Sequence, residues 1–276
     1  MEVCVLSIEK KRDKVAGAIY GFAIGDAMGA TTEFMTMSQI QQTYGEVKNI
    51  IGGGWLNLTP GEVTDDTQMS MCVMDSLMKH SFRLTKFENS CADNFVEWFK
   101  TGPKDVGSQC AKGIREIMAG RRIDVDENAL GNGSLMRAMP CALVNNSVFN
   151  ELQGKLTHNN YTCTRAIKIY SNLIQSHLHS KNITIGTNCL MAPFGHVKNT
   201  LNNSIYWSQK DSFKEAIIGA VNHGGDADTI AAITGSIAGA KFGYHAIPKK
   251  WIKQLNPDVK EFLEKFKIFT FSYLQS

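Results

Sequence analysis

The sequence predicts an all-α fold in which residues 1–276 form a single domain of many short helices. Three observations lead to this prediction. Apolar side chains recur at intervals of three and four residues in most segments, which is the period of a helix that buries one face. Two further segments carry small residues at strict intervals of four. No series of alternating apolar and polar residues, and no alternation of strands with helices, indicates a sheet.

The composition is that of an ordinary globular protein and limits its partners. Hydrophobic residues make up 43% of the chain, and 29 basic and 26 acidic residues leave a net charge of +3. The basic residues form only short clusters, so the charge indicates no nucleic-acid partner. No apolar run reaches the ~20 residues of a membrane span. The seven cysteines are scattered without a CxxC pair, which disfavours a zinc site and suits a reducing compartment. With no signal-peptide pattern, this predicts a cytoplasmic protein, with a monomer as the default.

Residues 13–30 and 230–243 predict two helices that each carry a stripe of small residues. The stripes are Gly17, Gly21, Gly25 and Gly29 in the first, and Ala231, Gly235, Gly239 and Gly243 in the second. Glycine inside a helix costs about 1 kcal/mol relative to alanine. We therefore predict that the two helices pack backbone against backbone. The alternative is that each packs separately against large side chains. Asp26 on the first helix is expected to form a buried structural hydrogen bond.

The remaining helices follow from apolar spacing and from turn residues. In chain order they are expected over 64–79, 84–100, 108–119, two helices within 150–180 broken around 155–160, a short helix from 248, and a last helix over 257–274. Thr157 is expected to cap the second helix of the pair, with His158 in its first turn. The glycine-rich loop over 50–62 predicts turn structure, and residues 181–210 predict only an irregular helical segment.

Two of the helix starts are rich in acidic residues. Residues 64–67 read TDDT and residues 226–229 read DADT. Such residues can simply be helix caps, and Asp65 with Gln68 resembles a capping box. If the two helix ends meet, however, four carboxylates and two threonine hydroxyls converge, and these charges cannot all stay ionised without a cation. Oxygen ligands without His or Cys favour Mg²⁺, Mn²⁺ or Ca²⁺ over zinc, and four carboxylates balance two divalent ions.

The DADT segment has a second interpretation. It resembles the DxDx[TV] motif of phosphatases that use an aspartyl nucleophile. That motif follows a hydrophobic strand of a parallel sheet. Here AVNHGG precedes it, and no alternation of strands and helices is present, so this interpretation is the weaker one.

Four other sites carry polar groups with an ordinary structural interpretation. Gly131-Asn132-Gly133-Ser134 reads as a turn whose backbone amides open a helix, which is either a plain glycine-rich helix start or a cradle for an anion or a diphosphate. Glu33 alone would be a solvated loop residue, Asp105 a turn cap, and His158 a structural histidine.

Five blocks of the sequence together resemble the ADP-ribosylglycohydrolase family. They are GAIYGFAIGDAMGATTEF over 17–34, TDDTQM over 64–69, GNGSLMRAMP over 131–140, THNNYTCTRA over 157–166, and NHGGDADTIAAITGSIAGAKFG with the following IPKKW over 222–251. The combination of TDDTQ with GGDADT makes the resemblance specific. It implies an orthogonally packed, multi-helix all-α fold, two Mg²⁺ or Mn²⁺ ions, and hydrolysis of the bond that joins ADP-ribose to a protein side chain or a small-molecule acceptor.

The resemblance also implies roles for individual residues. The implied metal ligands are Thr64, Asp65, Asp66, Asp226, Asp228 and Thr229. Glu33 would lie beside the metals, Asp105 near the reacting ribose, and either could act as the base. The implied substrate-binding residues are Gly133, Ser134 and Leu135 at the diphosphate and His158 at a ribose.

A second class of function is a non-catalytic relative that binds ADP-ribose or serves a structural role. A lapsed enzyme is expected to lose some of its carboxylates. All six implied ligand positions and Glu33 are filled here, which favours an active enzyme. Residues 181–210 depart most from the family pattern, so the acceptor stays open.

Overall fold

The computed structural model describes residues 7–80, 83–181, 187 and 189–274. Within these residues it contains thirteen α-helices, one 3-10 turn and no strand, which confirms the all-α prediction. The helices are α1 (Ile8–Gly29), α2 (Met37–Tyr44), α3 (Asp65–His80), α4 (Leu84–Lys100), α5 (Ser108–Met118), α6 (Met139–Leu143), α7 (Ser147–Lys155), α8 (Tyr161–Leu178), α9 (Val197–Ser208), α10 (Phe213–His223), α11 (Ala227–Phe242), η1 (Tyr244–Ala246), α12 (Lys249–Gln254) and α13 (Pro257–Tyr273). Among the described helices, none combines the length and apolarity that a membrane span requires.

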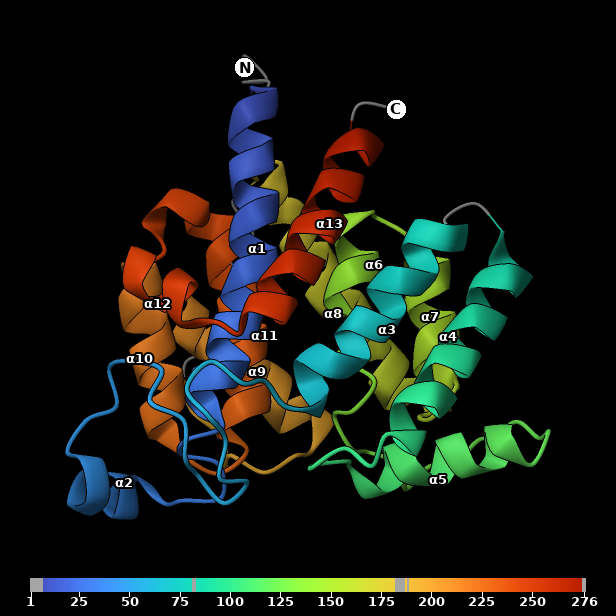
Figure 1. Ribbon diagram of the computed structural model, residues 1–276, viewed down its shortest axis with the longest axis horizontal. Helices are drawn as coiled ribbons and strands as arrows, with labels where there is room; N and C mark the ends of the chain where they lie inside the picture. The colour runs from blue at the N-terminus through green and yellow to red at the C-terminus, as the bar shows by residue number, and fades with distance from the viewer. Residues whose placement is uncertain (1–6, 81–82, 182–186, 188, 275–276) are drawn as a thin grey trace.

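Helices α1 and α11 form the centre of the bundle and pack directly against each other (Figure 1). The two glycine stripes lie in this contact and run in opposite directions. A Cβ atom added at Gly29 would lie 2.5 Å from the carbonyl oxygen of Ala227, and one added at Gly17, Gly21 or Gly25 would lie closer still to a carbonyl oxygen of α11. Large side chains cannot separate helices at this distance. The prediction of backbone-to-backbone packing is therefore confirmed.

The same contact fixes where α3 begins. Asp26 on α1 is fully buried, and its carboxylate accepts hydrogen bonds from the amide and hydroxyl of Thr64 and from the amide of Thr67. These bonds tie the first turn of α3 to the end of α1, next to the start of α11. The structural role predicted for Asp26 is confirmed, and this residue brings the two acidic helix starts together.

The loop after α1 is tied to the start of α11 by backbone hydrogen bonds. The Phe34 amide donates to the Gly225 carbonyl, and the Gly225 amide donates to the Met35 carbonyl. Gly225 has φ +65, and a Cβ there would clash with Pro193. The two glycines before DADT therefore let the segments around Met35 and Pro193 approach the start of α11. The loop that carries Glu33 lies over the N-terminus of α11.

Several local predictions were wrong. Asp65 and Gln68 form no capping box, because the side-chain amide of Gln68 donates to the Val63 carbonyl and the Thr64 hydroxyl caps α3 by accepting from the Asp66 amide. Asn160, rather than Thr157, caps α8.

Other corrections concern short elements. His158 lies in the loop before α8, outside its first turn. Residues 133–137 form successive turns, so the GNGS segment does not open a helix directly and α6 begins only at Met139. Helix α2 was not predicted, because eight residues give too little apolar periodicity.

Candidate metal centre and substrate cavity

A cavity of about 230 Å³ opens where the N-terminal ends of α3 and α11 meet. Most of the predicted site residues line it: Glu33, Asp65, Asp66, Asp105, Gly133, His158, Asp226, Asp228 and Thr229. The N-termini of two helices add positive potential to this end of the bundle, which favours anionic groups. Segments far apart in the sequence thus converge on one acidic cavity, as the two acidic motifs predict.

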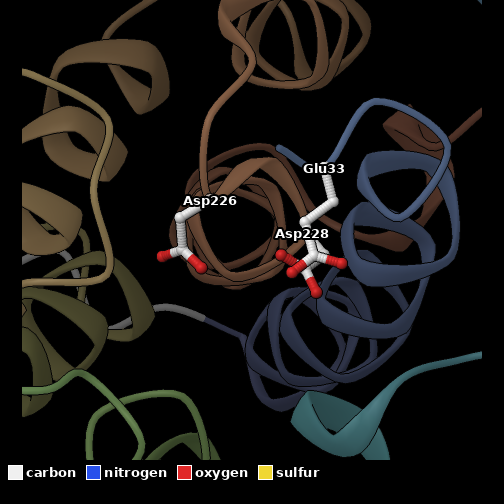
Figure 2. Close-up of side chains that lie close together, drawn as sticks. All are labelled: Glu33, Asp226 and Asp228. Atoms are coloured by element: carbon white, nitrogen blue, oxygen red, sulfur yellow. The ribbon is translucent and has the colours of Figure 1, made fainter. Parts of the chain in front are cut away.

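Three carboxylates of the cavity lie close enough together to hold a single ion. Glu33, Asp226 and Asp228 each place a carboxylate oxygen within 4.8 Å of the others. Figure 2 shows the side chains of Glu33 and Asp228 directed toward the same point, with Asp226 on the neighbouring part of the helix start. The Thr229 hydroxyl donates to Asp66 Oδ2 over 3.2 Å, which joins the start of α11 to α3. The two acidic motifs therefore contact each other.

These carboxylates do not serve as helix caps. Asp226 is the N-cap residue of α11, yet its side chain makes no capping hydrogen bond. It accepts from the side-chain amide of Asn132 over 2.6 Å instead. At α3 the threonine Thr64 supplies the cap. Capping therefore accounts for Thr64 but not for the carboxylates of the two motifs.

Two buried carboxylate oxygens have no hydrogen-bond donor within the described residues. They are Asp66 Oδ1 and Asp228 Oδ1, on side chains of residues only 1% and 2% exposed. An unpaired buried charge is costly, and a cation is the partner that satisfies it. The donor set of carboxylates and a hydroxyl is that of a hard divalent ion such as Mg²⁺ or Mn²⁺. The residues present therefore fit a metal site.

Burial and mutual repulsion raise the pKa values of the cluster. Burial raises the pKa of Asp66 and of Asp228 well above the usual range, and neighbouring carboxylates add to the rise. Burial, together with nearby aspartates, raises the pKa of Glu33 and of Asp65 to about 8. Metal-free, such a cluster binds protons at neutral pH, and a divalent cation would compete for the same oxygens.

Two predicted residues lie at the edge of this cluster. Thr64 does not line the cavity, and its hydroxyl donates to Asp26 over 2.9 Å. The same Thr64 hydroxyl lies 3.4 Å from Asp66 Oδ2. Asp105 lies in the loop before α5 and lines the cavity, and burial raises the pKa of its carboxyl. The next turn places the Gly107 amide 3.4 Å from Asp65 Oδ2. Asp105 therefore lines the same cavity as Glu33, while Thr64 is positioned mainly as a structural link.

Three residues that the sequence reasoning missed hold the carboxylates in place. Trp55 donates its indole N–H to Glu33 Oε2 over 2.6 Å. Asn132 donates to Asp226, and the Thr200 hydroxyl lies 3.0 Å from the same amide nitrogen. Asn132 belongs to the GNGS segment, so its role could have been suspected. No spacing pattern in the sequence links Trp55 or Thr200 to the acidic motifs.

Two of the four predicted substrate-binding residues line the cavity. Gly133 and His158 line it, and a Cβ at Gly133 would lie 2.8 Å from the His158 ring. Ser134 and Leu135 are fully buried and lie behind the cavity wall. The Leu135 amide already donates to the Asn132 carbonyl. Of the three residues expected at a diphosphate, Gly133 is the one that faces the cavity.

Comparison with known proteins identifies the class of this fold and site. The ADP-ribosylglycohydrolase profile matches residues 7–188 and 185–270. The chain is 33% identical to the ADP-ribosyl-[dinitrogen reductase] glycohydrolase of Rhodospirillum rubrum, over 90% of this chain and 92% of that protein. It is 27% identical to the ADP-ribosylarginine hydrolase Tri1 of Serratia proteamaculans, over 91% of this chain and 78% of that protein.

A solved structure supports the same assignment. An ADP-ribosylglycohydrolase-related protein complex contains a chain that superimposes with a TM-score of 0.80 at 25% identity, covering 97% of this chain and 99% of that chain. The protein is thus a hydrolase of the class that acts on glycosidic bonds. It belongs to the ADP-ribosylglycohydrolase family. The phosphatase interpretation of DADT is wrong, because helix α10 precedes this segment in place of a strand.

Proposed function

We propose that the protein is a hydrolase with two divalent metal ions that releases ADP-ribose from an ADP-ribosylated acceptor. One observation carries the proposal: the carboxylates of two distant helix starts converge on one cavity, and two of their buried oxygens have no donor within the described residues. The proposed ligands are Thr64, Asp65, Asp66, Asp226, Asp228 and Thr229. When bound, Mg²⁺ or Mn²⁺ would act as a Lewis acid toward sugar hydroxyls and a water molecule.

The chain itself would position the sugar and move the proton. Cleavage at the ribose C1″ carbon develops positive charge on the sugar, as in other glycoside hydrolysis, and the surrounding carboxylates stabilise this charge. Glu33 and Asp105 both line the cavity, so either of them, in its ionised form, would accept the proton of the attacking water. Trp55 fixes the direction of the Glu33 carboxylate. Gly133, with Ser134 and Leu135 behind it, and His158 would hold the nucleotide end.

The acceptor is proposed to be an ADP-ribosylated arginine of a protein. The names of two relatives support this, since one acts on ADP-ribosyl-dinitrogen reductase and the other on ADP-ribosylarginine. An apolar groove of about 660 Å³ adjoins the acidic cavity and shares Phe34, Gly195 and Asp226 with it. Phe34 and Phe194 in this groove are 65% and 69% exposed. The peptide that carries the modified side chain would lie there.

The protein is proposed to act in the cytoplasm and as a monomer. The six cysteines that the structure describes are all free thiols, which suits a reducing compartment. The weak net charge gives no reason to add a nucleic-acid partner.

The test is release of ADP-ribose from defined substrates. Arginine-linked, serine-linked and O-acetyl conjugates are incubated with the protein in the presence of Mn²⁺ or Mg²⁺, and again after addition of EDTA. We expect release from the arginine-linked substrate, loss of release with EDTA, and recovery on addition of excess Mn²⁺. Binding of ADP-ribose without release from any substrate would instead support a non-catalytic ADP-ribose binder.

A further inference from the structure

A buried arginine lies next to Cys110, a residue that lines the cavity. Arg137 is fully buried, and no carboxylate pairs with it in the described part of the chain. Its guanidinium donates to the side chain and the carbonyl of Gln153 over 2.8 and 2.9 Å, and to the Thr157 hydroxyl over 2.7 Å. Its central carbon lies 4.5 Å from the centre of the Phe95 ring. Burying a cation with neutral partners alone is costly, so this arrangement calls for a role beyond packing.

The arginine determines how the Thr157 hydroxyl is used. A guanidinium only donates hydrogen bonds, so the Thr157 oxygen accepts from Arg137. The hydroxyl proton must then point elsewhere, and a buried donor left unpaired is unfavourable. His158 Nδ1 lies 2.8 Å from this oxygen. The Cys110 sulfur, which also lies within hydrogen-bond reach of the Thr157 side chain, is the competing acceptor and a much weaker one.

The charge on Arg137 favours the same arrangement. A protonated Nδ1 would point its N–H toward a hydroxyl that already accepts from a cation. An unprotonated Nδ1 instead presents a lone pair to a hydroxyl that Arg137 polarises, which is a cooperative chain. Burial, with the charge of Arg137, also lowers the pKa of His158 to about 3. The ring is therefore neutral, and a neutral ring with a free Nδ1 carries its proton on Nε2.

The other side of the ring faces the cavity. His158 is 2% exposed and lines the cavity together with Gly131 and Gly133. A Cβ at Gly131 would lie 3.2 Å from His158 Nε2, so the glycine leaves the ring nitrogen accessible. Within the described residues, no protein group hydrogen-bonds to Nε2. This nitrogen is therefore directed at a ligand.

We propose that Arg137 and Thr157 are positioning residues that hold His158 as the neutral tautomer protonated at Nε2. The His158 ring then presents one fixed N–H donor, at Nε2, to the cavity and offers it no acceptor. The ligand atom opposite must accept a hydrogen bond, as an oxygen of ADP-ribose does. Only this last step rests on the proposed function, because the tautomer is a property of the ligand-free protein.

The test uses the imidazole ¹⁵N NMR spectrum of the full chain, in which the His158 signals are identified by their loss in His158→Gln. In the wild type we expect an unprotonated Nδ1 and a protonated Nε2 that do not change between pH 8 and pH 5. Thr157→Val keeps the shape of the side chain and removes the hydroxyl that links Arg137 to His158 Nδ1, so its spectrum should show a mixture of tautomers. Thr157→Ser restores the hydroxyl and should restore the wild-type spectrum.

Calorimetric titration with ADP-ribose gives the second measurement. We expect Thr157→Val to weaken binding about 5- to 10-fold, the effect of one hydrogen bond, and Thr157→Ser to bind as the wild type does. A protonated Nδ1 in the wild type, or equal binding by the valine variant, would overturn the proposal. If the wild type shows the expected tautomer but binds no ADP-ribose, the proposed function fails and the tautomer assignment stands.

Discussion

Replacement of Asp228 by asparagine is expected to abolish turnover and to leave the chain folded. Asp228 is 2% exposed, and its Oδ1 has no donor among the described residues. Asn has nearly the same shape but lacks the charge that a divalent ion requires. We expect kcat to fall at least about 100-fold, the effect of removing one electrostatic group at a reaction centre. The measurement is ADP-ribose release at saturating Mn²⁺.

The same variant should raise the stability of the metal-free protein. The folded carboxyl group has a pKa well above that of the unfolded chain because of burial and of nearby Glu33 and Asp66. The folded state therefore binds protons more tightly, so the unfolding free energy of the metal-free protein falls as pH rises above the unfolded value of about 4. Asn removes one such group. At pH 8 the metal-free variant should melt at a higher temperature than the metal-free wild type.

Asp93→Asn is the matched control, because this aspartate is exposed on α4 and lies outside the cavity. It should retain activity and the melting temperature of the wild type. Full activity of Asp228→Asn would contradict the metal assignment, and a lower melting temperature than that of the wild type under metal-free conditions would contradict the raised pKa of Asp228.

Replacement of Gly25 by alanine is expected to destabilise the protein by about 2–3 kcal/mol, in the range of overpacked cores. In an open helix the same change stabilises by about 1 kcal/mol, because glycine is the poorer helix former. Here a Cβ at Gly25 would overlap the Ala231 carbonyl and would lie 2.8 Å from the Ala232 backbone nitrogen. Backbone atoms of a buried helix cannot move aside as a flexible side chain does. Urea unfolding in the presence of Mn²⁺ measures the change.

Gly154→Ala supplies the control for this prediction. Gly154 is also helical, in α7, but the nearest atom to its added Cβ is the end of the Ile167 side chain at 3.0 Å, which can shift. Its effect should stay within about 1 kcal/mol in either direction. Equal stability of Gly25→Ala and the wild type would mean that α1 and α11 do not approach as closely as described.

The central helix pair could be predicted from the sequence because its signal is local and costly. Small residues at every fourth position of two segments favour the close approach of another backbone, and α1 and α11 meet through those residues. The meeting of the two acidic motifs was a conditional prediction. In the structure the two motifs meet because Asp26 ties the start of α3 to the end of α1.

The groups that orient the acidic side chains could not be predicted. Trp55 reaches Glu33 from a turn after three glycines, and Thr200 reaches Asp226 from α9, in a region of weak periodicity. Such contacts depend on the tertiary arrangement, which no spacing rule encodes. Asn132 is an intermediate case: the GNGS turn was recognised, but its amide side chain binds a carboxylate while the backbone amides were expected to bind an anion.

Asp66 at the start of α3 and the carboxylates at the start of α11 are proposed to bind metal ions together. The stoichiometry of metal binding tests this proposal most directly. Titration calorimetry of the chelator-treated protein with Mn²⁺ should give about two ions per chain, as in other two-metal sites. Asp66→Asn and Asp228→Asn should each lose at least one of them, and Asp93→Asn should lose none. No uptake of Mn²⁺ or Mg²⁺ by the folded wild type would contradict the account.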